Sequence, residues 1–252
     1  MAIYVHISVL MAARAISTGS RKEQEMKKRY IVMAAAVLSA VITVCGCSLE
    51  SADEKEIVTT LSMSDLETIN GGKMPEIQYY YDSDRISLVY GKVSDTKVNN
   101  KDDALYVFKE LSGLLNISDA ESDLRFSVKN PNKGGGIYVF DQYYKDIPTN
   151  GSISLSVDSE GNTTRLLNRY IPDIDISVEP ELSAEDAAKK AEKKYNAKNR
   201  EDPKLLVCYI DKKVKLVWDV KLRRSDYPDE VFIDAFNGDI VDEDGPISEV
   251  EQ

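Results

Sequence analysis

The chain has 252 residues, 42% hydrophobic and 30% charged, with a formal net charge of −11 at pH 7. This is an ordinary globular composition with enough apolar material for a core, and the length allows one or two domains. The acidic excess argues against binding to nucleic acid, whose phosphates need a basic patch, and against lying flat on an anionic membrane.

The N-terminal residues have the layout of a secretory signal. Residues 1–25 show no pattern typical of folded structure, and we interpret them as an over-called start. Residues 26–47 begin with Met26, which we interpret as a second, more natural start; three basic residues and an apolar run follow, and the segment ends in Cys45-Gly46-Cys47. The apolar run is shorter than the ~20 residues that a membrane-spanning helix needs. This order of regions predicts a cleaved export signal.

The end of this signal resembles a bacterial lipobox, with Cys47 as the lipidated residue. The alternative is an uncleaved N-terminal anchor helix, and both interpretations place the remaining chain outside the membrane. A diacyl anchor binds more strongly than a single acyl chain, so we expect stable attachment to the membrane through Cys47. The expected location is the extracytoplasmic face of a bacterial cell membrane.

Removal of the leader makes the remaining chain more acidic and leaves it one cysteine without a lipid. Residues 1–47 hold six basic and two acidic side chains, a net of +4, so the rest carries −11 − 4 = −15. We interpret this negative charge as a feature that keeps the chain soluble at the cell surface. Cys208 then has no disulfide partner within the chain. Because no histidine accompanies it, its strand-like apolar run predicts a buried small hydrophobe and not a nucleophile.

Residues 48–76 are predicted to be a loosely packed tether. A pattern typical of a capping box, Ser64 and Glu67, predicts one short helix there. The helix would stop at residues 70–72, Asn-Gly-Gly, because these residues tolerate the left-handed backbone of a helix end.

Residues 77–100 predict a β region, with the best strand at 86–90. The hydrophobic period then changes to that of a helix over 102–115. Its apolar positions are Ala104, Val107, Phe108, Leu111, Leu114 and Leu115. A strand at 124–128 follows, and residues 130–136 are rich in Gly, Pro and Asn and predict a loop.

Residues 136–172 contain three β runs separated by two predicted turns. Apolar side chains alternate with a period of two, as a strand with one buried face requires. Residues 146–151 interrupt the first alternation, because Pro148 supplies no N–H and Asn and Gly tolerate turn dihedrals. Residues 158–162 form the second predicted turn.

This stretch resembles the fungalysin/thermolysin propeptide (FTP) domain, the folding and inhibitory pro-segment of thermolysin-like metallopeptidases. The resemblance implies an FTP-like domain over 77–172. The chain departs from the family pattern at Asp146, Thr149 and Arg169. The residues that carry the resemblance are Gln142, Tyr144, Lys145, Ile147, Pro148, Gly151, Asp158 and Gly161.

Residues 173–181 are predicted to be an acidic linker, and a helix capped by Ser183 follows. Three strands come next, at 205–210, 214–220 and 230–236. Asn237-Gly238 is a strong hairpin signal and predicts a short last strand.

One helix followed by antiparallel strands, with Trp218, Asp234 and Gly238 in the pattern, resembles a PepSY domain. The resemblance implies a PepSY-like domain over 182–247, followed by a tail at 248–252. In thermolysin-like precursors an FTP domain followed by a PepSY domain is the usual order of the pro-segment. The motif residues are therefore expected to be structural.

The sequence lacks the side chains of the common catalytic sites. Its only histidine is His6, so it has no HExxH metallopeptidase motif and no Ser-His-Asp or Cys-His arrangement. Gly134-Gly135-Gly136 precedes a strand and lacks the Lys-Ser/Thr of a phosphate loop. We therefore expect no enzymatic activity, no catalytic or metal-binding residues and no cofactor.

Two acidic clusters admit an interpretation as calcium sites, because Ca²⁺ prefers several oxygen ligands. For residues 158–162 the favoured interpretation is a polar hairpin turn. For Asp239 and residues 242–244 the favoured interpretation is a solvated acidic tail. Asp234 lies in the middle of a predicted strand, and if it faces inward it should bond backbone N–H groups, because a buried charge needs partners.

The aromatic residues suggest either a contact surface or ordinary strand packing. Trp218 shares its strand face with apolar side chains and is expected in the core. The tyrosines at 79–81 and 143–144 are the better candidates for a contact surface, although half-buried strand residues remain the favoured interpretation.

We therefore expect an α+β fold of two small domains, each an antiparallel sheet packed on one main helix. The chain ends at Gln252 with no peptidase domain. The predicted function is that of a non-catalytic surface lipoprotein that inhibits or assists the folding of a secreted metallopeptidase in trans. The alternative is a sensory or structural surface lipoprotein that binds a peptide, an envelope component or a membrane protein.

Overall fold

The computed structural model describes residues 58–81, 83–132, 134–223 and 228–243. The helices are α3 (Met63–Ile69), α4 (Lys101–Glu110), α5 (Ser112–Leu115), α6 (Ala120–Asp123) and α7 (Ala184–Tyr195). The strands are β1 (Glu76–Tyr79), β2 (Ile86–Tyr90), β3 (Leu124–Asn132), β4 (Gly135–Tyr144), β5 (Ile147–Asp158), β6 (Thr163–Asn168), β7 (Lys198–Asn199), β8 (Lys204–Ile210), β9 (Lys213–Arg223), β10 (Glu230–Asp234) and β11 (Ile240–Glu243).

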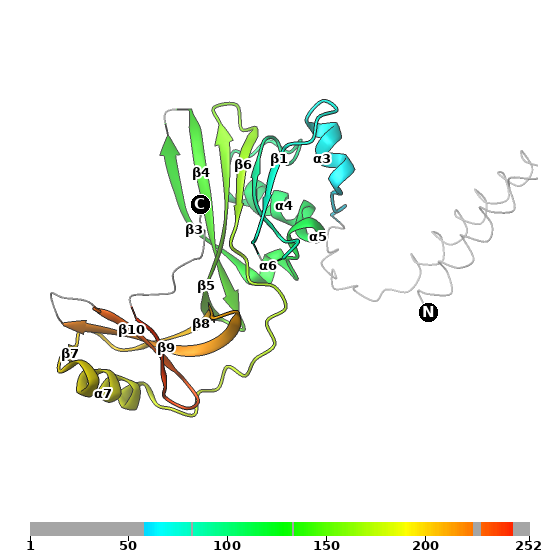
Figure 1. The fold of residues 1–252 in the computed structure, drawn as a ribbon. Coiled ribbons are helices and arrows are strands. Elements are labelled where there is room, and N and C mark those ends of the chain that lie inside the picture. Colours follow the sequence, from blue (N-terminus) through cyan, green and yellow to red (C-terminus); the bar gives the residue numbers. More distant parts are fainter. Residues whose placement is uncertain (1–57, 82, 133, 224–227, 244–252) are drawn as a thin grey trace, which may run out of the picture. The chain divides into compact units, whose positions relative to one another are not determined.

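The prediction of two small domains, each with its own sheet on one main helix, is wrong. The described strands form one mixed sheet of 11 strands, with the order β1-β2-β6-β5-β8-β9-β10-β11 and with β3 on β4, β4 on β5 and β7 on β9 (Figure 1). The join is a parallel pairing of β5 with β8, where Thr149 lies opposite Val207. Asn150 holds this join, because its Oδ1 accepts a hydrogen bond of 2.9 Å from the Tyr209 N–H.

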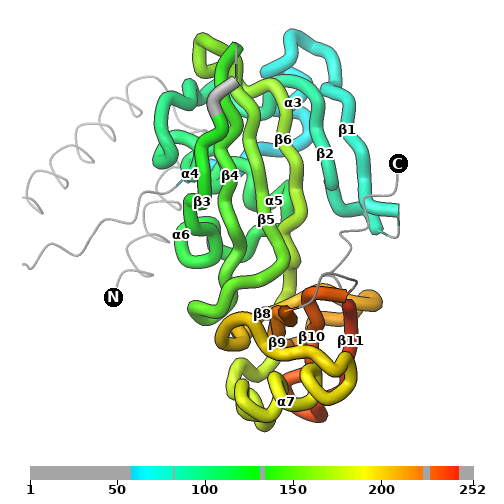
Figure 2. Tube along the Cα trace, turned by 90° about the vertical axis from the view of Figure 1, so that its left-hand side faces the viewer, coloured from blue at the N-terminus to red at the C-terminus, as the bar shows by residue number. Residues whose placement is uncertain are grey.

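The first core lies between α3–α6 and one face of the strands β1–β6. Figure 2 shows β3, β4, β5, β6, β2 and β1 side by side. The helical period of 102–115 is confirmed, and Val107 and Phe108 are fully buried. The helix breaks at Leu111, which caps α4 and precedes α5. Four short helices therefore pack here where one main helix was expected.

The tether prediction is wrong for the residues of this segment that the structure describes. Leu66 of α3 is 1% exposed and belongs to the first core. The capping box consists of Ser62 and Asp65 and not of the predicted Ser64 and Glu67. The predicted stop is confirmed, because Asn70 caps α3 and is followed by two glycines with positive φ. The segment packs because Leu66 reaches the first core, against which Leu61 and Met63 also pack.

The three β runs of 136–172 are confirmed, but the first turn is shorter than predicted. Only Lys145 and Asp146 turn, with φ of 48° and 66°, as a two-residue type I′ hairpin requires. Pro148 already pairs with Tyr143 inside the ladder.

The predicted loop at 130–136 is largely strand. β3 extends to Asn132 and β4 begins at Gly135. Proline is tolerated at 131 because β3 is an edge strand. At Gly135 a Cβ would overlap the Val157 carbonyl oxygen, so only glycine permits this close approach of β4 to β5.

The C-terminal elements follow the predicted order. Ser183 caps α7, whose Ala187 and Ala191 are fully buried against β9 and β10. The Asn237-Gly238 hairpin between β10 and β11 is confirmed. β9 is buried on both faces, since the neighbours Leu216 and Val217 are each at most 1% exposed. Apolar side chains alternate along this strand, and this pattern predicts one buried face. The structure buries both faces.

Residues 173–181 contain no helix or strand, as expected of a linker, yet they are packed. Ile174 and Ile176 pack against the apolar cluster that includes Val207, Leu216 and Ala235. The backbone N–H groups of Glu181 and Leu182 both donate to the Ala235 carbonyl oxygen. The segment is thereby held along the C-terminal strands.

Candidate interaction surfaces

Gln142 holds the chain after β6 in place. It lies at a bulge in β4, is 1% exposed, and points toward Ile171. Its Nε2 donates to the Ile171 carbonyl oxygen at 2.7 Å, and its Oε1 accepts from the Ile171 N–H at 2.7 Å. A side chain at Gly151 would overlap Gln142 Oε1 and lie 3.1 Å from the Arg169 carbonyl oxygen. Gln142 therefore holds the backbone at Ile171, and Gly151 leaves the space that this contact needs.

The remaining motif residues of the first half also have packing or turn contacts. Tyr144 and Ile147 pack against the cluster of Val207 and Leu216. Gly161 has a φ of 78° in the turn between β5 and β6, where a Cβ would lie 3.1 Å from the Val98 carbonyl oxygen. Pro148, as described above, sits in the β4–β5 ladder.

The motif residues of the second half fix the β10–β11 hairpin and the start of α7. Trp218 is partly buried, and its Nε1 donates to the Leu182 carbonyl oxygen at 2.8 Å. Asp234 Oδ1 accepts hydrogen bonds from the N–H groups of Phe236 and Asn237, at 3.0 and 3.3 Å. The expected bonding of Asp234 to backbone is confirmed. Gly238 has a φ of 76°, and a Cβ there would overlap Lys190 Nζ.

The acidic clusters are used by the fold itself. Asp158 Oδ1 accepts from the N–H groups of Glu160 and Asn162, so the prediction of a polar hairpin turn is confirmed. The hydrogen bond from the Asn162 side chain is the main cause that lowers the pKa of Asp158. Asp242 and Glu243 belong to β11 and not to a tail, and Glu243 accepts from Tyr195 and Lys194. Within the described ranges no three His, Cys, Asp or Glu side chains gather as a metal site does.

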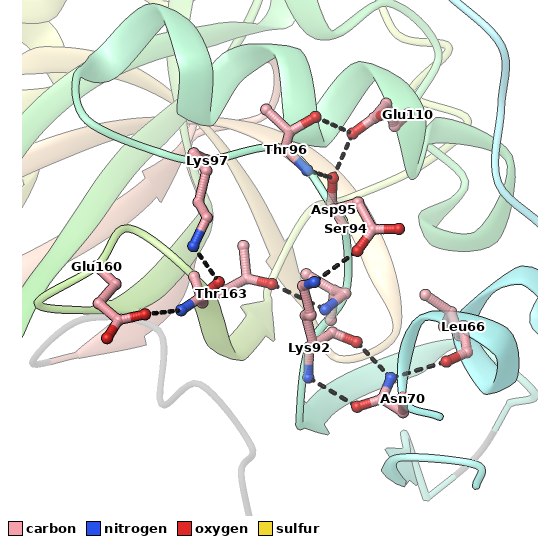
Figure 3. Close-up of polar contacts among 12 residues, drawn as sticks. Leu66, Asn70, Lys92, Ser94, Asp95, Thr96, Lys97, Glu110, Glu160 and Thr163 are labelled. Atoms are coloured by element: carbon pink, nitrogen blue, oxygen red, sulfur yellow. Dashed lines mark hydrogen bonds and ion pairs between the residues drawn. The ribbon is translucent and has the colours of Figure 1, made fainter. Parts of the chain in front are cut away.

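A polar network joins the segment after β2 to three other elements (Figure 3). Asn70 at the end of α3 donates to the Lys92 carbonyl oxygen and accepts from the Lys92 N–H. Glu110 of α4 accepts from the hydroxyls of Ser94 and Thr96, at 2.6 and 3.2 Å. Thr163 at the start of β6 accepts from the Val93 N–H. These bonds tie the segment after β2 to α3, α4 and β6, so the network is a structural support.

The tyrosines at 79–81 lie at an edge of the sheet. Among the described strands β1 pairs only with β2. Tyr79 is 51% exposed and Tyr81 is fully exposed, which favours the contact-surface interpretation for these two residues. Tyr80 differs, because its hydroxyl donates to the Asn168 carbonyl oxygen. At 143–144 the half-buried interpretation is confirmed, since Tyr144 packs in a core and Arg125 stacks 3.9 Å over Tyr143.

Arg85 stacks on Tyr80, and Arg169 follows Asn168, whose carbonyl oxygen accepts from the Tyr80 hydroxyl; the sequence patterns did not single out the two arginines as a pair. The Arg85 guanidinium lies 4.9 Å from the centre of the Tyr80 ring and donates to the Tyr170 carbonyl oxygen. The charges of Arg85 and Arg169 both lower the pKa of Tyr80, although burial is stronger and raises it overall. The only signal in the sequence was that Arg169 departs from the family pattern.

The opposite edge strand, β3, is protected against pairing. Within the described residues it pairs only with β4. It has a bulge between Phe126 and Val128 and carries the exposed cations Arg125 and Lys129. Bulges and charges on an edge strand prevent unwanted addition of another strand. β1 is only four residues long and has a bulge between Gln78 and Tyr79; it carries one glutamate and no cation.

A half-buried carboxyl group, that of Asp219, lies on β9. Burial, and then the neighbouring charge of Glu230, raise the pKa of Asp219 to about 7, while Lys221 and Lys204 oppose the shift. Asp219 Oδ1 has no hydrogen-bond partner among the described residues. Burial also raises the pKa of the Cys208 thiol, so the prediction of a buried small hydrophobe is confirmed.

We expect Asp219 to make the fold less stable as pH rises. The folded carboxyl holds its proton up to about pH 7, whereas the unfolded one loses it near its ordinary pKa of 3.8. The stabilising contribution is complete below the unfolded pKa and is lost as pH rises through the folded pKa. The urea midpoint of unfolding should therefore fall across this window in the wild type. In Asp219→Asn the fall should be smaller.

The control for this measurement is Asp239→Asn, which removes one exposed carboxylate from the same sheet. Its midpoint should depend on pH as that of the wild type does. If the urea midpoint fell equally with pH in Asp219→Asn and in the wild type, the pH dependence would not come from Asp219.

A basic surface hollow lies at the C-terminal end of α7. Its volume is about 600 Å³, and its lining includes Lys189, Lys193, Lys198, Arg223 and Glu192. Two of the lysines already have partners, because Lys189 pairs with Glu185 at 2.7 Å and Lys198 with Glu192 at 3.2 Å. The hollow is thus a solvated charged surface.

The membrane-related predictions lie outside the described residues. This holds for the signal at 26–47 and the lipidated Cys47. The helices that are described are all too short or too polar to cross a bilayer.

Comparison with known proteins yields distant structural similarity only, to three solved chains. No family model matches the chain, and no curated protein matches it. Among solved structures, the Bacillus megaterium YpeB C-terminal domain is similar, with 13% sequence identity and a TM-score of 0.35. The similarity covers 73% of this chain and 97% of that one. A TM-score this low supports no inference about fold or function.

Proposed function

We propose that this chain is a non-catalytic binding module, related to peptidase pro-segments, that acts on a secreted metallopeptidase in trans. It inhibits the peptidase or assists its folding, and Cys47 anchors it by lipid to the outer face of the cell membrane. The observation that carries the binding role is the edge of β1, which has no second partner among the described strands and presents exposed Tyr79 and Tyr81. An edge of this kind accepts an extended segment as an added strand.

The class of partner comes from the sequence resemblance. The motif residues of both halves hold backbone or pack in cores, as expected of structural positions in a pro-segment. The absence of histidine from residues 7–252 supports a role without catalysis. Binding through a sheet edge needs no reactive side chain.

The test is a titration of the full chain, purified in mild detergent, into a thermolysin-like peptidase secreted by the same organism. Cleavage of a short peptide should fall in a dose-dependent, saturable way while the chain itself stays intact. Tyr79→Ala should weaken inhibition about tenfold, because a truncated aromatic anchor at an interface costs 1 kcal/mol or more. The matched control, Tyr90→Ala, removes another exposed tyrosine, 42% exposed, from the neighbouring strand.

Inhibition that is equal for Tyr79→Ala and the wild type would reject the β1 edge as the contact. Digestion of the chain without inhibition, together with no gain in refolding of the denatured peptidase, would reject the peptidase partner. The alternative of a sensory or structural surface lipoprotein would then be favoured, and its partner would be sought among membrane proteins.

A further inference from the structure

We propose that Asp219 and Glu230 form a proton-dependent latch between β9 and β10, which holds the two strands together in acid and loosens as the pH rises to neutrality and above. The inference is independent of the partner proposed above. It begins from the register of the two strands. Asp219 lies opposite Phe232. Two residues further along β9, Lys221 lies opposite Glu230. Because opposed residues and residues two apart share one face of a sheet, the two carboxyl groups are diagonal neighbours within reach of each other.

The cluster around this pair holds more carboxyl groups than cations. Lys221 Nζ lies 3.8 Å from Glu230 and 3.7 Å from Glu201, so one cation serves two carboxylates. The second cation is Lys204, which lies opposite Asp219 on β8. Asp219 is half-buried, and its Oδ1 has no hydrogen-bond partner among the described residues. A negative charge on Asp219 is therefore poorly compensated, which makes it costly to bury.

A proton on Asp219 removes this cost and turns the pair into a contact. The protonated Asp219 carboxyl donates a hydrogen bond to the Glu230 side chain across the ladder of β9 and β10. Burial, then the negative charge of Glu230 and then this hydrogen bond raise the pKa of Asp219 to about 7. The charges of Lys221 and Lys204 oppose the shift. Once Asp219 ionises, the donor is lost and two carboxylates face each other across the strands.

The other groups that face Asp219 do not take over this contact. The Cys208 thiol of β8 stays protonated, because burial and then the charges of Asp219 and Asp242 raise its pKa. Asp242 of β11 lies opposite Phe232 and adds negative charge to the same row of side chains. Phe232 is 2% exposed, and its apolar ring offers Asp219 no acceptor. Glu230 is thus the acceptor that the structure gives to the Asp219 proton.

Loss of the latch should loosen one end of the β9–β10 ladder. The stabilising contribution is complete below the unfolded pKa of 3.8 and is lost as pH rises through the folded pKa of about 7. The affected end is the one nearest Glu230, where the Leu222 N–H donates to the Asp229 carbonyl oxygen at 2.7 Å. At the other end of β10 the Gly238 N–H donates to the Asp234 carbonyl oxygen at 2.9 Å. This hairpin bond does not involve the latch.

The experiment measures hydrogen exchange of single amides by NMR on the full chain in mild detergent, at about pH 5.5 and about pH 8, on either side of the expected loss. Rates are expressed as protection factors, which remove the intrinsic pH dependence of exchange. The protection of Leu222 should fall about tenfold relative to Gly238, which is less than the full shift of Asp219 allows because the pair is partly exposed. An infrared difference spectrum over the same range should show the loss of a protonated carboxyl band.

Three variants separate the latch from a general effect of charge. Asp219→Asn should remove both signals, because asparagine cannot ionise and keeps a donor for Glu230. Glu230→Gln should reduce the fall in protection, since it removes the like charge. The matched control is Glu201→Gln, which takes a carboxylate from Lys221 but none from the pair. Its Leu222 protection should fall as in the wild type.

Equal protection of Leu222 at the two pH values in the wild type would overturn the latch, as would a fall that persists in Asp219→Asn. An absent fall in Glu201→Gln would assign the effect to the ion pairs of Lys221 and reject the carboxyl pair. If the urea midpoint depends on Asp219 while Leu222 keeps its protection relative to Gly238, Asp219 sets only the global stability and the latch is wrong. If Asp219→Asn does not fold, Glu230→Gln decides, and an unchanged fall in that variant contradicts the proposal.

Discussion

Replacement of Gln142 by leucine is expected to lower the free energy of unfolding by about 2–6 kcal/mol. The two side chains have similar volume, so the loss comes from hydrogen bonding and not from a cavity. Ile171 is 7% exposed, and both its N–H and its carbonyl oxygen would lose their Gln142 partner. Each buried group left unpaired costs about 1–3 kcal/mol. Urea unfolding followed by circular dichroism measures this loss at an unchanged m-value.

The control for this variant is Gln78→Leu on β1. Gln78 is exposed, and its side chain makes one hydrogen bond to the described residues, of 3.4 Å to Glu76. An exposed substitution of this kind changes stability by less than about 0.5 kcal/mol. If Gln142→Leu were as stable as Gln78→Leu, the two hydrogen bonds to Ile171 would not hold the chain after β6. The role that we assign to this motif residue would then be wrong.

Leu66→Ala is expected to cost about 2–5 kcal/mol, the range for removal of a buried leucine side chain. Leu66 belongs to α3, in the segment for which the sequence predicted a loose tether. It is 1% exposed and packs in the same core as Phe108 and Leu111. Asn70 holds the end of α3 to the segment after β2 with hydrogen bonds of 2.7 and 3.1 Å. The loss is measured by the same urea titration.

Met74→Ala is the matched control, because Met74 lies in the same segment but is 46% exposed. Its effect should stay within about 0.5 kcal/mol. Two equal, small effects would mean that α3 is a loosely attached tether after all. A large effect of Leu66→Ala alone would establish that the core begins before β1.

The local sequence pattern was sufficient to predict those elements whose signal lies within a few neighbouring residues. The period of two in β4 and β5, the helical period of α4 and the Asn237-Gly238 hairpin are read from neighbours in the chain. Backbone dihedral preferences and side-chain direction act over the same short range. These elements were therefore predicted with the right type and order. The exact turn at Lys145 and Asp146 was missed, because the signal of Pro148 and Gly151 outweighed it.

The amino-acid sequence by itself thus determined the order of strands and helices and the acidic charge. Only the tertiary structure decided that β5 joins β8, that Leu66 reaches the core, and that Arg85 stacks on Tyr80. The physical reason is that burial, unpaired charge and shifted pKa values depend on which distant segments come together. No periodicity within one segment carries that information.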